Sequence, residues 1–245
     1  MLDVEAKADI PPGGGLGCSA ALGVAIARAV EGAIDVGGDI PSRVAARATA
    51  WEGVFHGNPS GIDTAAAIAG CFLWFERGVG TSVLEAPCDV WLAIGYSGTS
   101  ASTKTMVEGI ARIKDRNPAL FEKFLEGVRA ISKNAKLALD AGDGRALGQL
   151  MDMNQMLLAG VLLSTEPIES MIASARQAGA LGAKLTGSGG GGSVIALGGV
   201  CPHGELGSPA EASAKRLAQS WNDAGYPSFP TRISGRAQLT AGRTS

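Results

Sequence analysis

The sequence has little of what several common classes of site require. Its 245 residues include only four cysteines and two histidines. The cysteines, at positions 18, 71, 88 and 201, are far apart and form no Cys-x-x-Cys pair. This spacing argues against both a structural zinc site and a disulfide framework. Free cysteines suit a reducing compartment, so we expect a cytoplasmic protein.

Long apolar runs and runs of one charge sign are also lacking. The formal net charge is -2 at pH 7, and no long basic stretch is present, so neither nucleic acid nor an anionic membrane is the expected partner. The longest apolar stretch, Ser19 to Val30, contains Arg28 and is too short to span a bilayer. Residues 1–7 lack the basic and apolar regions of a signal peptide. We therefore expect a small-molecule partner.

Glycine, by contrast, is abundant. The chain has 36 glycines, about twice the usual share of roughly 7%. They follow no Gly-X-Y period, and many fall in two clusters, at residues 13–17 and 187–192. Because 46% of the residues are hydrophobic, the chain can also build a real core. The glycine clusters are therefore the places where binding chemistry is expected.

Hydrophobic periodicity predicts the elements of the first third of the chain. Alternating apolar and charged residues over Leu2 to Lys7 predict a strand, and Ser19 to Val30 reads as a helix packed on several sides. A second helix is predicted to begin at Ser42, whose hydroxyl can cap free backbone N–H groups. A third helix is expected to begin near Ile62 and Asp63, after a turn.

The rest of the chain mixes strands and helices without strict alternation. Short apolar runs predict strands at residues 71–75, 90–94, 183–185 and 194–197. Helices are expected between Thr103 and Gly179, with Pro167 in a first turn, and Ser208 to Glu211 reads as a capping box. This pattern favours an α+β fold over a doubly wound sheet. We predict two domains, residues 1–88 and 89–245.

The first glycine cluster lies in P-P-G-G-G-L-G-C-S-A-A, residues 11–21, and runs directly into a predicted helix. Glycine backbone N–H groups and a helix N-terminus together suit an anion, so a phosphate loop is predicted. No lysine follows as in a Walker A motif, and the third glycine of G-x-G-x-x-G is absent. A flexible turn before a buried helix is the alternative. The candidate binding residues are Pro12, Gly13, Gly14, Gly15, Leu16, Gly17, Cys18 and Ser19.

Two carboxylates, Glu52 and Asp63, stand eleven residues apart with the turn sequence G-N-P-S-G between them. Phosphoryl transfer from ATP requires an oxygen ligand for Mg²⁺ and a carboxylate near the attacking hydroxyl. A turn that folds the chain back would bring both acids to one site. Each alone has an ordinary interpretation, Glu52 as a solvated helix residue and Asp63 as a helix-start acid.

The second glycine cluster lies in K-L-T-G-S-G-G-G-G, residues 184–192, between two predicted strands. Such a run permits positive φ and close backbone approach, although a flexible hairpin connection is the alternative. Its candidate binding residues are Gly187, Gly189 and Gly190.

Together these segments resemble the GHMP family of small-molecule kinases. Residues 11–21 are similar to the second GHMP motif, with Gly14 in place of Ala and Cys18 in place of Ser, and residues 184–192 are similar to the third, with Ser188 in place of Ala. The stretch H-G-N-P-S-G-I-D, residues 56–63, resembles the mevalonate kinase branch of the family. A less specific likeness covers residues 102–104 and 160–164, which occupy the places of substrate-side segments.

The resemblance implies a fold, two cofactors and a reaction. The fold would be the two-domain GHMP kinase fold, with a ribosomal protein S5 domain 2-like N-terminal part and a ferredoxin-like helical C-terminal part. ATP and Mg²⁺ would be the cofactors, with Ser19 and Glu52 holding the metal and Asp63 accepting the substrate hydroxyl proton. The second glycine cluster would lie against the phosphate loop, and His56 is expected to be structural. The reaction would be phosphorylation of the primary hydroxyl of mevalonate, in isoprenoid and lipid biosynthesis.

The front of the chain departs from the family pattern. Only ten residues precede Pro11, whereas the family carries the first GHMP motif there, with a lysine that polarises the substrate hydroxyl. We therefore expect an incomplete N-terminal domain, which exposes apolar surface and favours a homodimer or association with a missing N-terminal segment. Two alternatives stay open: a GHMP kinase for another hydroxyl substrate such as a related mevalonate derivative, homoserine or a sugar, and an inactive truncated nucleotide-binding homologue.

Overall fold

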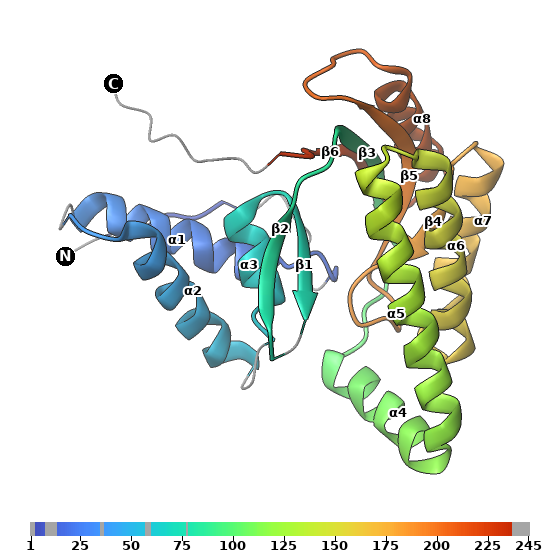
Figure 1. The fold of residues 1–245 in the computed structure, drawn as a ribbon, viewed down its shortest axis with the longest axis horizontal. Helices are drawn as coiled ribbons and strands as arrows, with labels where there is room; N and C mark the ends of the chain where they lie inside the picture. Colours follow the sequence, from blue (N-terminus) through green and yellow to red (C-terminus); the bar gives the residue numbers. More distant parts are fainter. Residues whose placement is uncertain (1–2, 8–13, 35–36, 57–59, 77, 237–245) are drawn as a thin grey trace. The chain divides into compact units, whose positions relative to one another are not determined.

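The structure, a computed structural model, describes residues 3–7, 14–34, 37–56, 60–76 and 78–236, without the side chains of Phe55 and His56. The chain forms two compact units (Figure 1). Unit 1 comprises Met1–Pro12, Leu16–Glu85 and Arg236–Ser245, and unit 2 comprises Gly13–Gly15 and Ala86–Gly235. The chain therefore passes from unit 2 to unit 1 within the first glycine cluster.

Unit 1 combines helices with a β-hairpin. Its described elements are α1 (Cys18–Ile34), α2 (Ile40–His56), α3 (Ile62–Ala69), β1 (Phe72–Glu76) and β2 (Gly80–Leu84). β1 and β2 pair antiparallel, and both α2 and α3 pack against α1. A small core joins Val24 and Ala27 of α1 to Val44 and Ala48 of α2. The predicted core helix is thus found, beginning at Cys18.

A buried ion pair also links α1 to α2. Glu31 of α1 is 2% exposed and accepts hydrogen bonds from Arg43 Nε at 2.5 Å and Arg47 Nε at 2.6 Å. These two hydrogen bonds hold the pKa of Glu31 below its ordinary value. Because both arginines lie on α2, these charge-assisted hydrogen bonds connect α1 to α2.

Two local predictions for unit 1 were wrong. α2 begins at Ile40, ahead of Ser42, because Asp39 takes the capping role: its carboxylate accepts from the Ser42 N–H at 3.2 Å and from the Ser42 hydroxyl at 2.5 Å. The strand predicted over Leu2 to Lys7 is absent from the described residues 3–7, which are exposed. Alternation marks which side chains share a face, but a strand also requires a partner strand for its backbone.

Unit 2 is built on a four-stranded antiparallel sheet in the order β4-β5-β3-β6. Its elements in chain order are β3 (Cys88–Tyr96), α4 (Thr103–Arg116), α5 (Pro118–Asp140), α6 (Gly144–Gly160), α7 (Glu166–Gln177), β4 (Ala183–Leu185), β5 (Ser193–Pro202), α8 (Pro209–Asp223) and β6 (Ser228–Ile233). Strand, helices, two strands, helix and strand in this sheet order form a ferredoxin-like unit with extra helices. The predicted α+β, ferredoxin-like C-terminal part is confirmed.

The main core of unit 2 lies between the sheet and helices α7 and α8 (Figure 1). Trp221 of α8 is fully buried there and donates its Nε1–H to the carbonyl of Met171 at 2.9 Å. Gly95 of β3 leaves room for this ring, since a Cβ at Gly95 would lie 2.6 Å from it. Large side chains on the helices are thus matched by small residues on the strands.

Most predicted elements of unit 2 are present. The strands expected at 90–94, 183–185 and 194–197 correspond to β3, β4 and β5, and Pro167 lies in the first turn of α7. Ser208 caps α8 by accepting from the Glu211 N–H at 3.2 Å. β2 and β6 were not predicted, because both are short and largely exposed or half-buried, and β6 contains Pro230.

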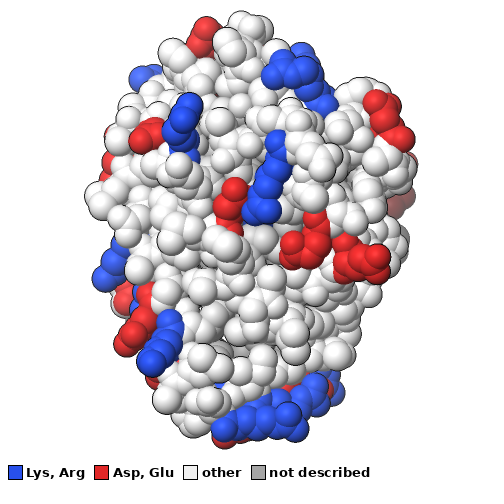
Figure 2. Space-filling view, turned by 90° about the vertical axis from the view of Figure 1, so that its right-hand side faces the viewer, with Lys and Arg blue, Asp and Glu red and all other residues white. Residues whose placement is uncertain are grey.

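The molecular surface mixes both charge signs. On the face shown in Figure 2, lysine and arginine side chains are interspersed with aspartate and glutamate. Two ion pairs of the described residues lie within helices: Lys136 pairs with Asp140 at 2.8 Å, and Lys215 pairs with Glu211 at 2.6 Å. Among the described helices, none is both long and apolar enough to cross a bilayer.

Candidate active site

The first glycine cluster has the backbone that its sequence predicts. Gly15 and Gly17 have φ values of 71° and 67°, which side-chain-bearing residues rarely adopt. α1 begins immediately afterwards, at Cys18. The backbone N–H groups of the first turn of α1 therefore follow directly on the glycine cluster, as an anion site requires. Of the candidate residues, Pro12 and Gly13 lie outside the described part of the chain.

Ser19 and Glu52 are brought together in unit 1. The Ser19 hydroxyl, in the first turn of α1, donates a hydrogen bond of 2.7 Å to Glu52 Oε1. Glu52 lies on α2 and is only 5% exposed. A buried carboxylate beside a hydroxyl is an arrangement of hard oxygen donors. The expectation that Glu52 is an ordinary solvated helix residue does not fit this burial.

A close helix contact holds these two side chains in register. Gly23 lies one turn after Ser19 on α1, and Trp51 precedes Glu52 on α2. A Cβ added at Gly23 would lie 2.6 Å from Cδ1 of Trp51. Only glycine lets the indole ring approach this far, and nothing in the local sequence marks Gly23 for this contact.

Asp63 lies beside the end of the glycine cluster. It occupies the first turn of α3, which follows Gly61 with φ of 80°. A Cβ at Gly17 would lie 3.7 Å from Cβ and 3.8 Å from Oδ1 of Asp63. Because Gly17 is two residues from Ser19, the acids Glu52 and Asp63 both lie around the start of α1. His56 ends α2, and its side chain is outside the described part.

The donor set around α1 fits Mg²⁺. Magnesium prefers oxygen ligands and is usually held by one or two protein side chains together with phosphate oxygens and waters. Ser19 Oγ and the buried Glu52 carboxylate supply two such oxygens. Among the described residues, no group of three or more His, Cys, Asp and Glu side chains forms a closed metal cage. These two oxygens are of the kind that Mg²⁺ takes from protein side chains.

The two glycine clusters touch within unit 2. A Cβ at Gly187 would lie 2.8 Å from Cα of Gly15, and one at Gly192 would lie 3.2 Å from the carbonyl oxygen of Gly14. Gly187 has φ of 79°. The third motif thus lies against the first loop through backbone alone, and glycine is required at these positions for steric reasons.

Gly189 and Gly190 make a different contact. A Cβ at Gly189 would lie 2.6 Å from the carbonyl oxygen of Leu163, and the Gly190 N–H donates to that oxygen at 2.8 Å. The loop continues past Thr99, whose carbonyl accepts from the Gly192 N–H at 2.7 Å. Gly190 and Gly192 therefore tie the loop to the segments that follow α6 and β3, respectively.

Lys184, at the start of the third motif, has an altered pKa. Burial lowers the pKa of its amine from 10.5 to about 8, and Nζ donates to the carbonyl of Leu185 at 2.7 Å. A neighbouring carboxylate would act in the opposite direction. The sequence identified Lys184 only as part of a motif, and nothing in the local pattern indicates that its side chain is covered.

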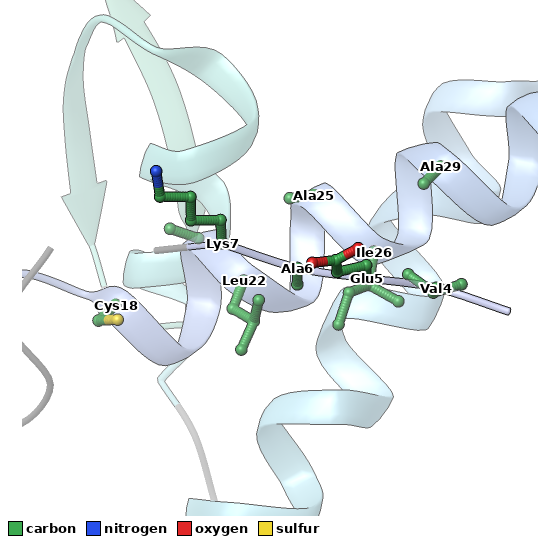
Figure 3. A pocket seen from close by; sticks show the side chains of 10 residues that line it. Val4, Glu5, Ala6, Lys7, Cys18, Leu22, Ala25, Ile26 and Ala29 are labelled. Carbon is green, nitrogen blue, oxygen red and sulfur yellow. The ribbon is translucent and has the colours of Figure 1, made fainter. Parts of the chain in front are cut away.

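A cavity of about 470 Å³ follows one side of α1 (Figure 3). Its walls are residues 4–7 and an apolar face of α1 that includes Leu22 and Ile26. Glu5 and Lys7 supply its charged groups, and Cys18 lies at one end. α1 is apolar on two sides: one side packs on α2, and the other lines the cavity.

Two family models match the chain. The model for the GHMP kinases N terminal domain matches residues 1–71, and the model for GHMP kinases C terminal matches residues 135–227. Residues 1–71 include Ser19, Glu52 and Asp63, and residues 135–227 include the third motif. The matched residues thus contain all three sequence motifs.

Curated relatives are similar to most of this chain. A mevalonate kinase of Methanothermobacter thermautotrophicus is 36% identical over 197 residues, which cover 80% of this chain and 64% of the relative. A mevalonate kinase of Pyrococcus abyssi is 34% identical over 203 residues, covering 80% of this chain and 59% of the relative. The chain therefore spans less than two thirds of the length of these relatives.

Solved structures share the fold. The crystal structure of L. major mevalonate kinase in complex with R-mevalonate matches with a TM-score of 0.78 and 28% identity, over 90% of this chain and 66% of that one. The Methanococcus jannaschii mevalonate kinase matches with a TM-score of 0.75 and 22% identity, over 93% of this chain and 67% of that one. The chain belongs to the GHMP kinase family.

Proposed function

We propose that this protein transfers the γ-phosphoryl group of ATP to the primary hydroxyl of mevalonate, giving 5-phosphomevalonate for isoprenoid synthesis. The observation that carries the proposal is the meeting of Ser19, Glu52 and Asp63 at the start of α1, directly after the glycine cluster. A purely structural helix start has no need of a buried carboxylate bonded to a hydroxyl. Phosphoryl transfer requires both a metal ligand and a separate acid near the acceptor.

In this proposal Ser19 and Glu52 hold Mg²⁺. When bound there, the ion would supply positive charge that stabilises the phosphate oxygens. The buried Glu52 supplies a full negative charge, and the hydroxyl of Ser19 supplies a neutral oxygen. The backbone N–H groups of the glycine cluster and of the first turn of α1 bind the phosphate oxygens.

Asp63 takes the role of proton acceptor or orienting group for the substrate hydroxyl. Its side chain is exposed at the first turn of α3, where the partial positive charge of the helix N-terminus favours the carboxylate. Such a group is effective mainly through its position, because the hydroxyl proton leaves as the new bond forms. Gly17, at the end of the glycine cluster, lies directly beside it.

Mevalonate is the proposed acceptor for two reasons. Residues 56–63 resemble the mevalonate kinase branch most closely, and the curated relatives described above are mevalonate kinases. The fold alone does not select the acceptor, since a homoserine kinase of Cytophaga hutchinsonii matches with a TM-score of 0.67 at 18% identity. Domains at 1–88 and 89–245, a cytoplasmic location and association with a further polypeptide remain parts of the proposal.

An acceptor panel tests the proposal. Mg-ATP is supplied with mevalonate, phosphomevalonate, homoserine or galactose, and ADP release is followed for the wild type and for Asp63→Asn. We expect release with mevalonate and a loss of about 10²- to 10⁴-fold in the variant, the range of general acid–base contributions. Faster turnover of another acceptor would contradict the substrate assignment, and an equally active Asp63→Asn would contradict the role of Asp63.

A further inference from the structure

Side chains of α6 pair with the free edge of strand β4. The Ala183 N–H donates to Asp152 Oδ1 at 2.9 Å, and the Leu185 N–H donates to Gln155 Oε1 at 2.9 Å. Alternate N–H groups of a strand point the same way, and residues three apart on a helix lie on one face. α6 therefore provides the hydrogen bonds that a neighbouring strand would otherwise make, and it covers the edge of the sheet.

The amide nitrogen of Gln155 also makes hydrogen bonds. Its Nε2 group donates to Ser164 Oγ at 3.1 Å and to Glu169 Oε1 at 2.9 Å. The residue is 2% exposed. Both N–H groups and the carbonyl oxygen of one buried amide are thus engaged, by the strand on one side and by the segment that follows α6 on the other.

That segment bonds the middle of the second glycine cluster. Leu163 precedes Ser164, and its carbonyl accepts the hydrogen bond from the Gly190 N–H at 2.8 Å. Leu162 adopts a φ of 63°, which is rare for a residue with a side chain and marks a tightly constrained turn. On the other side, Leu185 is the last residue of β4 before the loop. Gln155 therefore bonds the strand that enters the loop and the turn that anchors it.

We propose that Gln155 is a positioning residue that sets the conformation of residues 186–192 for nucleotide binding. Gln155 bonds Leu185 and Ser164 directly, and these two residues transmit its effect to the loop. This inference rests on the proposed function for its consequence in catalysis, but the loop conformation itself is measurable without any reaction. Asp152 also bonds β4, but its second partner is Arg176, at 3.1 Å, and not the turn after α6. Of these two side chains of α6, only Gln155 therefore connects β4 to that turn.

The first test compares Gln155→Met with the wild type. Methionine has a similar shape but neither donates nor accepts as an amide does. Hydrogen exchange of the backbone amides of residues 185–193 is followed in the free protein, and the affinity for a non-hydrolysable ATP analogue with Mg²⁺ is measured by calorimetry. We expect faster exchange at Gly190 and an affinity about tenfold weaker, as for a displaced group remote from the chemistry.

Two matched controls separate positioning from general loss of stability. Gln219→Met removes an exposed amide of α8 that bonds Asp223 at 2.7 Å, and it should leave both readouts unchanged. Ile172→Val removes a methyl group from the main core of unit 2. This control should lower the melting temperature without selective exchange at residues 185–193. If Gln155→Met changes only the melting temperature, as Ile172→Val does, the proposal is wrong.

Gln155→Glu provides a second variant with a pH readout. Its ionised carboxylate still accepts from the Leu185 N–H but cannot donate to Glu169, and protonation restores one donor. The charged groups around it are Glu169 of α7, the pair Asp152–Arg176 and Lys184, whose Nζ bonds the carbonyl of Leu185. We expect its nucleotide affinity, relative to the wild type, to recover as the pH falls from 8 towards 5.5, and an affinity ratio that does not vary with pH would contradict the role.

These outcomes are independent of the acceptor. A wild type that binds the nucleotide but does not phosphorylate mevalonate would overturn the proposed function and leave the loop measurements interpretable. Variants of Gln155 that match the wild type in both amide exchange and nucleotide affinity would overturn the positioning role, whatever the reaction. In the kinase assay, the role further predicts a raised KM for ATP with an unchanged KM for the acceptor.

Discussion

The hydroxyl of Ser19 donates a 2.7 Å hydrogen bond to the carboxylate of Glu52, across 33 residues of sequence. It joins the helix turn that follows the glycine cluster to a buried acid on the next helix. The two groups are close enough to bind one ion, and their mutual hydrogen bond preserves their positions in its absence.

The pair predicts a shared dependence on magnesium. We expect Ser19→Ala and Glu52→Gln each to raise the Mg²⁺ concentration for half-maximal activity by at least about tenfold. The double variant should be less impaired than the product of the single effects, because groups in contact are not additive. Titration of activity with Mg²⁺ provides the measurement. Glu122→Gln, an exposed acid on α5 that pairs loosely with Arg129 at 3.9 Å, is the control, and a similar effect there would refute the assignment.

Two glycines of α1 should respond oppositely to alanine. At Gly32 the added methyl meets nothing within 4 Å, so Gly32→Ala should raise the free energy of unfolding by about 0.5–1 kcal/mol. At Gly23 it would overlap Trp51, so Gly23→Ala should lower that free energy by about 1 kcal/mol or more, despite the better helix propensity. Urea denaturation measures both. Equal stabilisation by the two changes would show that the Trp51 contact is not tight.

The contact between the two glycine clusters predicts a specific loss of nucleotide binding. Gly187 has φ of 79° and its added Cβ would meet backbone of Gly15, whereas Gly179 has φ of 91° with open space around it. Alanine at either position is strained by about 1–3 kcal/mol. Only Gly187→Ala should also weaken Mg-ATP binding in calorimetry. A comparable loss of affinity in Gly179→Ala would mean that backbone strain alone is responsible.

Lys184 predicts an unusual dependence of stability on pH. Its pKa is about 8 in the folded protein and 10.5 without burial, so the unfolded chain binds more protons between these values and stability rises with pH there. The cost of burying the charged amine is fully present below pH 8. We expect Lys184→Met to be more stable at pH 7 by up to about 3 kcal/mol, from 1.36 kcal/mol per pKa unit.

The advantage of Lys184→Met over the wild type should disappear as the pH rises from 8 to 10.5. Denaturant unfolding of both proteins at pH 7, 9 and 10.5 checks this. Lys136→Met, which removes a half-exposed lysine paired with Asp140, serves as the comparison and should show no such convergence. A stability difference for Lys184→Met that is constant with pH would contradict the lowered pKa.

Asp89 predicts a loss of stability in acid. It is 2% exposed, and although burial tends to raise the pKa of Asp89, bonds from the Gly204 N–H, His203 and the Gly235 N–H, with the charge of Arg232, lower it overall. Its contribution to stability is therefore present above about pH 4, the unfolded pKa, and is lost as the pH falls through the lower folded value.

At pH 7 we expect Asp89→Asn to cost about 3 kcal/mol, as for the removal of one partner from a buried charge network. The exposed Asp140→Asn should cost less than about 1 kcal/mol. Chemical denaturation at pH 7 and pH 3 measures the difference, which should narrow at the lower pH. If Asp89→Asn were neutral at pH 7, the network would have no role in holding β3, β5 and β6 together.

Sequence signals predicted the fold correctly where the structure depends on adjacent residues alone. The capping box at Ser208 depends on four adjacent residues and is found as expected. The cap of α2 was misassigned because both Asp39 and Ser42 are suitable residue types, and only the backbone decides between them. At residues 3–7 the prediction failed for a non-local reason. Their alternating pattern suits a strand, but a strand also requires a partner strand.

The site was predictable to a similar extent. Gly15, Gly17 and Ser19 follow from one continuous motif. The roles of Glu52 and Asp63 came from resemblance, because nothing local distinguishes them from other helix acids. Gln155 could not be predicted at all: its partner Leu185 lies 30 residues away, and a glutamine in a helix carries no mark of its contacts.

The most direct test of the account is ³¹P NMR of the purified chain with Mg-ATP and mevalonate, beside a sample without mevalonate. The account predicts that ATP is consumed only when mevalonate is present, with ADP and a new phosphomonoester signal coupled to the C5 methylene protons appearing together. A folded chain that binds Mg-ATP but yields no phosphomonoester, or that phosphorylates another acceptor in preference to mevalonate, would contradict it.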